Sequence, residues 1–314
     1  RLSEVPDGIF LSEAAFDTLY GPARLYFLDP RERHLVPDHR WFPLRRGASA
    51  VLEALVEGPS AFLEGAVVNR VPATSGISEG SSTTGMDGTA QITVPEAIAG
   101  MPAGPRGLAL SQLEASLLSG VRLVMNGQDV VLDEQERAER ALPGHRPIAA
   151  GPTGVISLSD PGASTPAPQL VPAFSEIELS SPVIGQDGVL AAALGPDGAS
   201  VLIATTDDSL PLREAATGGS FVPPRVDDAG FVWTSTRSNP GALLALSGIG
   251  PDRDAKVDAP WLTGREIRAL DIAADATRMV VLSSDTAGAR VDLCAVVRDP
   301  SGAPASLTAP RPLR

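Results

Sequence analysis

Residues 226–234 have the sequence VDDAGFVWT, and they give the strongest indication of the fold of the second half of the chain. Val226 and the apolar run 231–233 flank an acidic turn that ends in Gly230, which is the pattern of two strands joined by a tight turn. Residues 190–198 (LAAALGPDG) and 269–275 (ALDIAAD) repeat the pattern in a looser form. The spacing of about 35–40 residues is typical of four-stranded propeller blades, which stack because one small sheet cannot bury both of its faces.

The length of this region limits the number of blades. Residues 154–314 have room for three or four of them, whereas a closed propeller normally has about four to eight. We therefore expect the ring to be incomplete in this chain. The predicted fold class is a small α+β domain followed by an all-β, partial propeller.

Composition agrees with a turn-rich β architecture. The chain has 314 residues with 31 glycines and 29 prolines, and only 4% of its residues are aromatic. Glycine and proline interrupt helices, so a helical bundle is disfavoured. At about 150 residues per domain, the length predicts two domains.

The first half has helical as well as strand patterns. Helices are predicted at 48–57 and 106–119, and strands at 24–28, 34–43 and 89–94. Residues 121–132 form a predicted hairpin, because Asn126-Gly127 readily adopts the two positive φ angles of a type I′ turn. The predicted organisation is an N-terminal approach segment (1–22), an α+β domain (23–142) and a propeller region (143–314).

Charge excludes some partners. The formal net charge is −13, which argues against nucleic acid and against an electrostatic grip on anionic membranes. The sequence has no apolar run of the ~18 residues that a membrane span needs, and no secretory leader is expected in it. Cys294 is the single cysteine, so no disulfide forms within the chain.

Two patterns resemble catalytic motifs. Residues 76–80 (GISEG) match the G-x-S-x-G nucleophile elbow around Ser78, with His145 downstream as a base. The elbow requires a buried strand before the serine and a helix after it. Polar and small residues stand on both sides instead, so a flexible loop is the favoured interpretation.

Metal-site patterns are equally incomplete. His34 and His39 stand near Asp38, but a spacing of five does not place both imidazoles on the same side of a strand. Asp252, Asp254 and Asp258 resemble a calcium loop, yet Lys256 and Val257 occupy its fifth and sixth places. A surface pair and a solvated loop are favoured. No catalytic, cofactor-binding or metal-binding residue is predicted.

The other conspicuous residues have structural interpretations. Asp227-Asp228 and Asp207-Asp208 are predicted to be turn acids. Trp233 is predicted to lie in the core, whereas Trp41 follows two charged residues and is a candidate interface residue. Cys294 shares a strand face with Asp292 and Val296, and is predicted to be an inert, partly buried thiol.

The first half of the chain resembles the GerMN domain found in LpqB-type lipoproteins. The resemblance rests on residues 25–30 (LYFLDP), 35–43 (LVPDHRWFP) and a helix that ends in 55–60 (LVEGPS). Residues 226–234 and 267–275 are similar to the LpqB β-propeller region. This sequence departs from the pattern because it has no lipobox cysteine, a short propeller, and Asp275-Ala276 where an Asp-Gly turn is usual.

The resemblance implies a membrane-anchored, extracytoplasmic lipoprotein of actinobacteria, with its lipid anchor outside this chain. It also implies a non-enzymatic accessory that contacts the extracytoplasmic part of a two-component sensor histidine kinase, in signalling tied to the cell envelope and division. Two alternatives stay open. One is a module that binds a cell-wall fragment or another small ligand, and the other is a hydrolase that uses Ser78 or a propeller-centred acid.

Overall fold

The chain divides into two units in the computed structural model. The first unit comprises residues 1–28, 35–60 and 69–139, and the second comprises 29–34, 61–68 and 140–314. The boundary at residue 140 lies close to the predicted one at 143. The structure describes residues 11–45, 47–73, 82–84, 90–117, 121–131, 137–144, 147–151, 154–158, 169–237 and 239–313.

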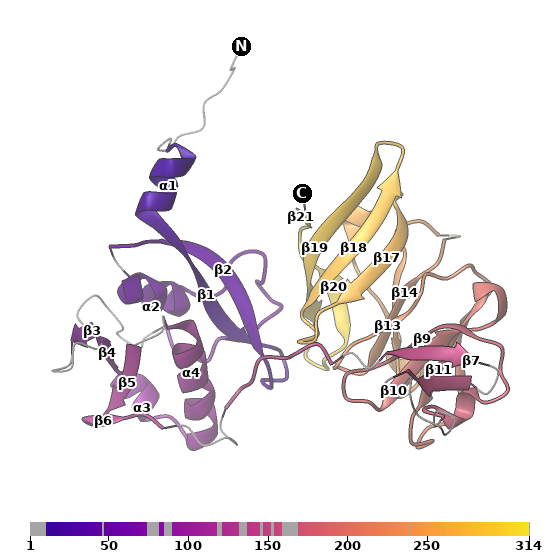
Figure 1. Ribbon diagram of the computed structural model, residues 1–314, viewed down its shortest axis with the longest axis horizontal. Helices are drawn as coiled ribbons and strands as arrows, with labels where there is room; N and C mark the ends of the chain where they lie inside the picture. Colours follow the sequence, from indigo (N-terminus) through magenta and orange to yellow (C-terminus); the bar gives the residue numbers. More distant parts are fainter. Residues whose placement is uncertain are drawn as a thin grey trace, which may run out of the picture. The chain divides into compact units, whose positions relative to one another are not determined.

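A long two-stranded antiparallel ribbon lies along one side of the first unit (Figure 1). Strand β1 spans Tyr20–Leu28 and β2 spans Leu35–Pro43. Residues 25–28 are at most 3% exposed, and Val36 is fully buried beside them. Strand β1 begins earlier than the predicted 24–28, because Tyr20 to Ala23 pair with the end of β2.

Proline protects both edges of this ribbon. The Leu44 N–H donates to the Leu19 carbonyl across the ribbon. Because the backbone alternates, the N–H positions of residues 22, 37 and 43 face away from the partner strand. All three residues are proline and donate no hydrogen bond, so the edges resist pairing with another chain.

Two helices pack on the ribbon. Helix α2 spans Gly47–Glu57 and α4 spans Ala103–Ser116. Helix α2 buries Val51, Leu52 and Leu55, as its apolar spacing predicts. Helix α4 lies three residues earlier than predicted, because proline is tolerated in a first turn and Leu117 adopts extended backbone.

The ribbon and α4 are also joined by polar bonds. The Gln112 side chain donates to the Tyr26 carbonyl (3.1 Å), and the Ser116 hydroxyl accepts from the Tyr26 N–H (2.9 Å). These bonds satisfy the buried edge of β1 where no further strand pairs with it.

A second sheet completes the first unit. Its strands lie in the order β3 (Ser82–Thr84), β4 (Ala90–Thr93), β5 (Val121–Met125), β6 (Gln128–Asp129). Strands β4 and β5 are parallel, and α3 (Glu96–Ala99) and α4 form the crossover between them. Asn126 and Gly127 have φ angles of 54° and 78°, so the predicted type I′ hairpin is confirmed.

Sequence patterns missed three short elements of this unit, α1, α3 and β3. Helix α1 (Glu13–Leu19) lies in the segment predicted as an approach segment, α3 lies before the predicted helix at 106–119, and β3 follows the loop predicted around Ser78. Ser12 is the N-cap of α1, and its hydroxyl accepts from the Ala15 N–H (3.2 Å). None of these short elements contains a long periodic pattern of apolar residues, so the sequence did not indicate a helix or a strand there.

The described part of the second unit is built mainly from successive antiparallel sheets (Figure 1). A hairpin of β7 (Ile148–Gly151) and β8 (Gly154–Ser157) comes first. Sheet I contains β9 (Ser180–Ile184), β10 (Leu190–Leu194), β11 (Ser200–Thr205) and β12 (Arg213–Thr217). Sheet II contains β13 (Arg225–Val226), β14 (Phe231–Ser235), β15 (Leu243–Ser247) and β16 (Ala255–Lys256).

Sheet III contains β17 (Glu266–Ile272), β18 (Arg278–Asp285), β19 (Gly288–Arg298) and β20 (Pro304–Leu307), with β21 (Arg311–Pro312) also pairing with β19. Short 3₁₀ turns connect several strands: η3 (Pro172–Phe174), η4 (Pro196–Gly198), η5 (Pro251–Arg253) and η6 (Pro260–Leu262). The predicted fold class, an α+β domain followed by an incomplete propeller-like region, is confirmed.

The repeat register differs from the prediction. The turn at 195–198 joins the second and third strands of sheet I, whereas those at 227–230 and 273–276 join first and second strands. The true counterpart is 185–188, where the Gly185 N–H bonds to Leu190 as the Ala273 N–H bonds to Arg278. The equivalent turns therefore begin at 185, 227 and 273, farther apart than predicted. The prediction aligned the wrong turn of sheet I because the same kind of turn can join any two antiparallel strands.

Alternating side chains bury both faces of the central strands. In β10, Leu190, Ala192 and Leu194 pack toward sheet II, and the alanines between them pack toward η3 and β8. In β14, Val232 packs toward sheet I, whereas Phe231 and Trp233 pack toward sheet III. The small alanines of β10 fit a strand that is covered on both faces.

Gly241 and Gly188 form a matched pair for testing the turns. Both have positive φ (89° and 73°), but a Cβ at Gly241 would lie 2.4 Å from the Leu262 carbonyl oxygen, whereas a Cβ at Gly188 meets nothing within 4 Å. We expect Gly188→Ala to lower the free energy of unfolding by about 1 kcal/mol through backbone strain alone. Gly241→Ala adds a clash and should cost about 3 kcal/mol.

Urea unfolding of the two variants against the wild type measures this difference. Equal losses in both variants would show that the η6 backbone moves aside without cost.

Candidate functional site

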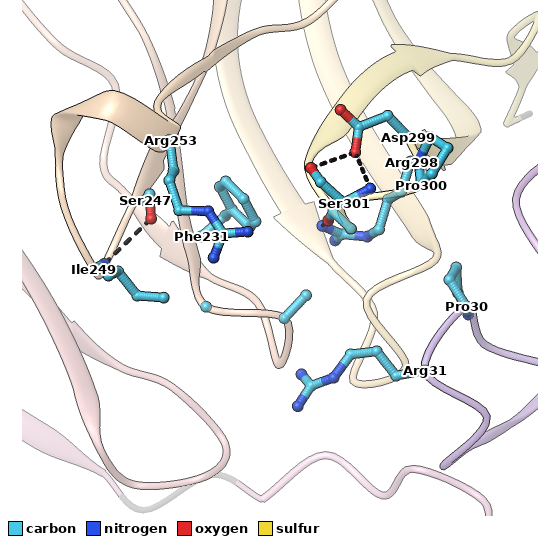
Figure 2. Close-up of a pocket in the computed structure, with 13 residues that line it drawn as sticks. Pro30, Arg31, Phe231, Ser247, Ile249, Arg253, Arg298, Asp299, Pro300 and Ser301 are labelled. Carbon is cyan, nitrogen blue, oxygen red and sulfur yellow. Dashed lines mark hydrogen bonds between the residues drawn. The ribbon is translucent and has the colours of Figure 1, made fainter.

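A pocket of about 450 Å³ lies at one end of sheets II and III (Figure 2). The turn before β14, the end of β15, η5 and the turn after β19 line it, together with Pro30 and Arg31 of the second unit. The lining residues of sheets II and III and their turns are Ala229, Gly230, Phe231, Ser247, Ile249, Arg253, Arg298, Asp299, Pro300, Ser301 and Gly302.

A buried ion pair supports this pocket. Asp227 begins the turn before β14, and its Oδ1 accepts from the backbone N–H groups of Ala229 and Phe231 (2.9 and 2.8 Å). Its Oδ2 accepts from Trp233 Nε1 (2.8 Å) and from Arg298 Nη2 (2.6 Å). The Asp227 and Arg298 side chains are 0% and 3% exposed.

Arg298 connects this turn to sheet III. Its guanidinium also donates to the carbonyls of Ala276 (3.1 Å) and Gly302 (3.2 Å), which belong to two turns of that sheet. The guanidinium carbon lies 5.7 Å from the centroid of the Phe231 ring, within cation–π range. The predictions of Asp227 as a turn acid and Trp233 as a core residue are confirmed. Sequence patterns did not reveal Arg298, since its partner is 71 residues away.

Asp299 caps the turn on the opposite rim of the pocket. Its Oδ1 accepts from the Ser301 hydroxyl (2.6 Å) and from the N–H groups of Ser301 (2.8 Å) and Ala303 (3.1 Å). The hydrogen bond from the Ser301 hydroxyl, the backbone bonds and the charge of Arg253 hold the pKa of Asp299 below its ordinary value. The carboxylate is therefore ionised at neutral pH.

Asp207 is a turn acid of the same kind. The Ser209 hydroxyl and backbone N–H lower the pKa of its carboxyl, and the Ser209 N–H donates to its Oδ1 (3.0 Å). The prediction of a turn acid at this position is confirmed.

The charge of the pocket differs from that of the chain. Its lining carries Arg31, Arg253 and Arg298 against the single acid Asp299. Arg298 is paired with Asp227, and Arg31 donates to the Asp228 carbonyl and lies 3.8 Å from the Asp228 carboxylate. Within the described residues no hydrogen bond or ion pair to the Arg253 guanidinium occurs, so Arg253 places a positive charge without such a partner at the pocket of a protein of charge −13.

An aromatic patch lies at the end of the ribbon in the first unit. Phe16 of α1 stacks on Tyr20 (centroids 5.0 Å apart, planes 9° apart) and meets Trp41 at 5.0 Å and 60°. Trp41 is 53% exposed, as its prediction as an interface residue requires, and Leu19 and Leu44 beside it are 45% and 58% exposed. We call Phe16, Leu19, Tyr20, Trp41 and Leu44 the aromatic patch.

The predicted metal-site candidates do not converge. Asp38 is buried, and its carboxylate pairs with Arg40 Nη2 (2.8 Å) and accepts hydrogen bonds from the Ser60 N–H and hydroxyl (2.8 and 3.0 Å). His39 is exposed, and His34 Nε2 lies 3.4 Å from an Asp228 oxygen. In the described ranges, no three His, Cys, Asp or Glu side chains come together as metal ligands would.

The prediction of a solvated loop at 252–258 is wrong for Asp254. Asp254 pairs with Arg213 of β12 through both carboxylate oxygens (3.0 and 3.1 Å), and it accepts from the Ser247 N–H (2.7 Å). It therefore connects sheets I and II. Asp252 and Asp258 are exposed. Ser78 and His145 lie outside the described residues, so the hydrolase alternative stays a prediction.

Cys294 is fully buried, deeper than predicted. Its Sγ lies 3.4 Å from the Met279 carbonyl oxygen, to which the thiol donates. Burial raises the pKa of Cys294 to about 12, and the charge of Asp292 adds to the effect.

No helix among the described residues is long and apolar enough to cross a membrane.

Comparison with known proteins gives two family matches. Residues 157–314 match the family described as the lipoprotein LpqB β-propeller domain, and residues 24–131 match a family described under sporulation and spore germination. The chain is similar to the lipoproteins LpqB of Rhodococcus opacus and Rhodococcus jostii, with 27% identity over 99% of this chain and 56% of each relative. It thus spans about half the length of these relatives.

Similarity to solved structures is weak. A putative 6-phosphogluconolactonase of Bacteroides fragilis has 14% identity and a TM-score of 0.34, over 54% of this chain and 53% of that one. A periplasmic gluconolactonase of Pseudomonas aeruginosa has 18% identity and a TM-score of 0.31, over 53% and 52%. Such scores carry no functional argument.

The buried thiol predicts a pH dependence of stability. The pKa of Cys294 is about 12 in the folded state against 9.0 for an ordinary thiol, so its contribution is complete below pH 9 and is lost as the pH rises toward 12. Well above pH 9 the loss approaches about 1.4 kcal/mol per pH unit. Urea unfolding at pH 8.5 and 10.5 should show a steeper loss in the wild type than in Cys294→Ala. Equal losses would contradict the buried-thiol account.

Proposed function

Because the chain belongs to the LpqB lipoprotein family, we propose that it is a non-catalytic, extracytoplasmic accessory protein that binds and modulates a two-component sensor histidine kinase. In this proposal the whole protein is attached to the cell membrane by a lipid. Its partner is the extracytoplasmic domain of the kinase, in signalling linked to the cell envelope and division.

The aromatic patch is the observation that supports binding to a protein. Trp and Tyr side chains dominate the energetics of protein interfaces, because they bury a large area with few rotatable bonds. Trp41 leaves about half of its surface in water, and Leu19 and Leu44 extend the apolar area around the ribbon end. The exposed atoms of these side chains do not contribute to the core, so binding of a protein partner would bury them.

The ribbon edges favour recognition through side chains. Pro22, Pro37 and Pro43 disrupt the outward N–H rows, so addition of a partner strand would lack hydrogen bonds at these positions. The partner therefore meets the aromatic rings. The net charge of −13 accelerates association with a basic surface and disfavours acidic partners.

Titration of the whole chain against the extracytoplasmic domain of the sensor kinase encoded beside it tests the proposal. We expect saturable binding that survives ~0.5 M salt, because screening at that strength weakens surface charge attraction. Trp41→Ala should weaken binding about tenfold or more. Leu44→Ala should weaken it less.

Leu212→Ala is the matched control for Leu44→Ala, since Leu212 is also exposed (40%) but lies in the second unit. It should leave the affinity unchanged. Absence of binding at high micromolar concentration would count against the kinase as partner. Equal effects of Trp41→Ala and Leu212→Ala would count against the patch.

A further inference from the structure

We propose that the pocket at the end of sheets II and III binds a sugar acid, a small ring that carries one carboxylate and several hydroxyl groups. The proposal is independent of the kinase proposal, because the pocket lies in the second unit and the aromatic patch in the first. Its volume of about 450 Å³ is within the range of small-molecule sites.

Arg253 indicates where the carboxylate of the ligand would bind. Figure 2 shows the Arg253 side chain reaching from η5 toward Phe231, on the same side as Ile249. Within the described chain its guanidinium has no hydrogen-bond or ion-pair partner, and such a group is suited to a bidentate bond with a carboxylate. Arg31 also lines the pocket, but it is paired with Asp228 (3.8 Å), so the assignment rests on Arg253.

The opposite rim of the pocket indicates where the hydroxyl groups of the ligand would bind. Asp299, Pro300 and Ser301 lie across the pocket from Arg253 (Figure 2). The Asp299 carboxylate is ionised and exposed, so it repels a second anionic group and accepts hydrogen bonds from hydroxyls. A ligand with negative charge at both ends is therefore disfavoured, and a monocarboxylate with hydrogen-bond donors at its far end is favoured.

The floor of the pocket is rigid and electrically neutral. Arg298 is held by Asp227 and by two backbone carbonyls, and Phe231 is 6% exposed beside it. Since Arg298 neutralises Asp227, that buried acid does not repel an incoming carboxylate. Ile249, which is 69% exposed, and Pro300 offer apolar walls to the C–H face of a sugar ring.

Calorimetric titration of the full chain with D-glucuronate, and with D-glucose as the neutral counterpart, tests this inference. We expect glucuronate to bind with a dissociation constant of about 1 mM or tighter, and glucose to bind at least about tenfold more weakly. Arg253→Gln should weaken glucuronate binding about tenfold.

Arg237→Gln is the matched control, because Arg237 is exposed and follows the far end of β14. It should leave glucuronate binding unchanged. Asp299→Asn tests the other rim: it should reduce the preference for glucuronate over acetate, which has no hydroxyl groups to donate.

Three results would overturn the inference. They are the absence of glucuronate binding at about 10 mM, equal binding of glucose, and equal loss in Arg253→Gln and Arg237→Gln. Kinase binding by the same Arg253→Gln sample separates the two proposals, because the aromatic patch is unchanged in it.

Discussion

The buried pair of Asp227 and Arg298 is the constraint on which the arrangement of sheets II and III depends. Asp227 holds its own turn through two backbone N–H groups and fixes Trp233 through the indole nitrogen. Arg298 carries the same network into two turns of sheet III. Removing one partner would leave an uncompensated buried charge, which is far more costly than losing an exposed pair. Arg213 and Asp254 connect sheets I and II in the same way at a more exposed position.

This network also explains why the pocket has the chemistry that it has. The Asp227–Arg298 pair is neutral and fixed, so the character of the pocket is set by its rim, where Arg253 and Asp299 stand opposite each other (Figure 2). The first unit contributes a surface of another kind, an exposed aromatic patch on a ribbon whose edges are blocked by proline. A rigid polar pocket and an apolar patch suit different ligands, and the two proposals are accordingly separate.

Much of the fold could be predicted because its signals are local. The Asn126-Gly127 hairpin, the apolar face of α2 and the strand-turn-strand units around 227–230 and 273–276 each follow from a few neighbouring residues. Strand β16 has two residues and carries no period, so it was missed. Trp41 and Asp227 were singled out from local context. Arg298, Arg253 and Arg213 were not singled out. The role of each depends on a partner or a pocket wall that is distant in sequence, and an arginine near a turn does not indicate such a contact.

Native-state hydrogen exchange at the Trp233 and Cys294 amides, one in each sheet, tests most directly whether the ion pair joins the sheets. Arg298→Met should lower the free energy of opening at both amides by about 3–5 kcal/mol, since Asp227 would stay buried without its partner. Adding Asp227→Asn should restore part of that loss, because it removes the unpaired charge. A change below about 1 kcal/mol, or a loss confined to β19 with β14 unaffected, would contradict the account.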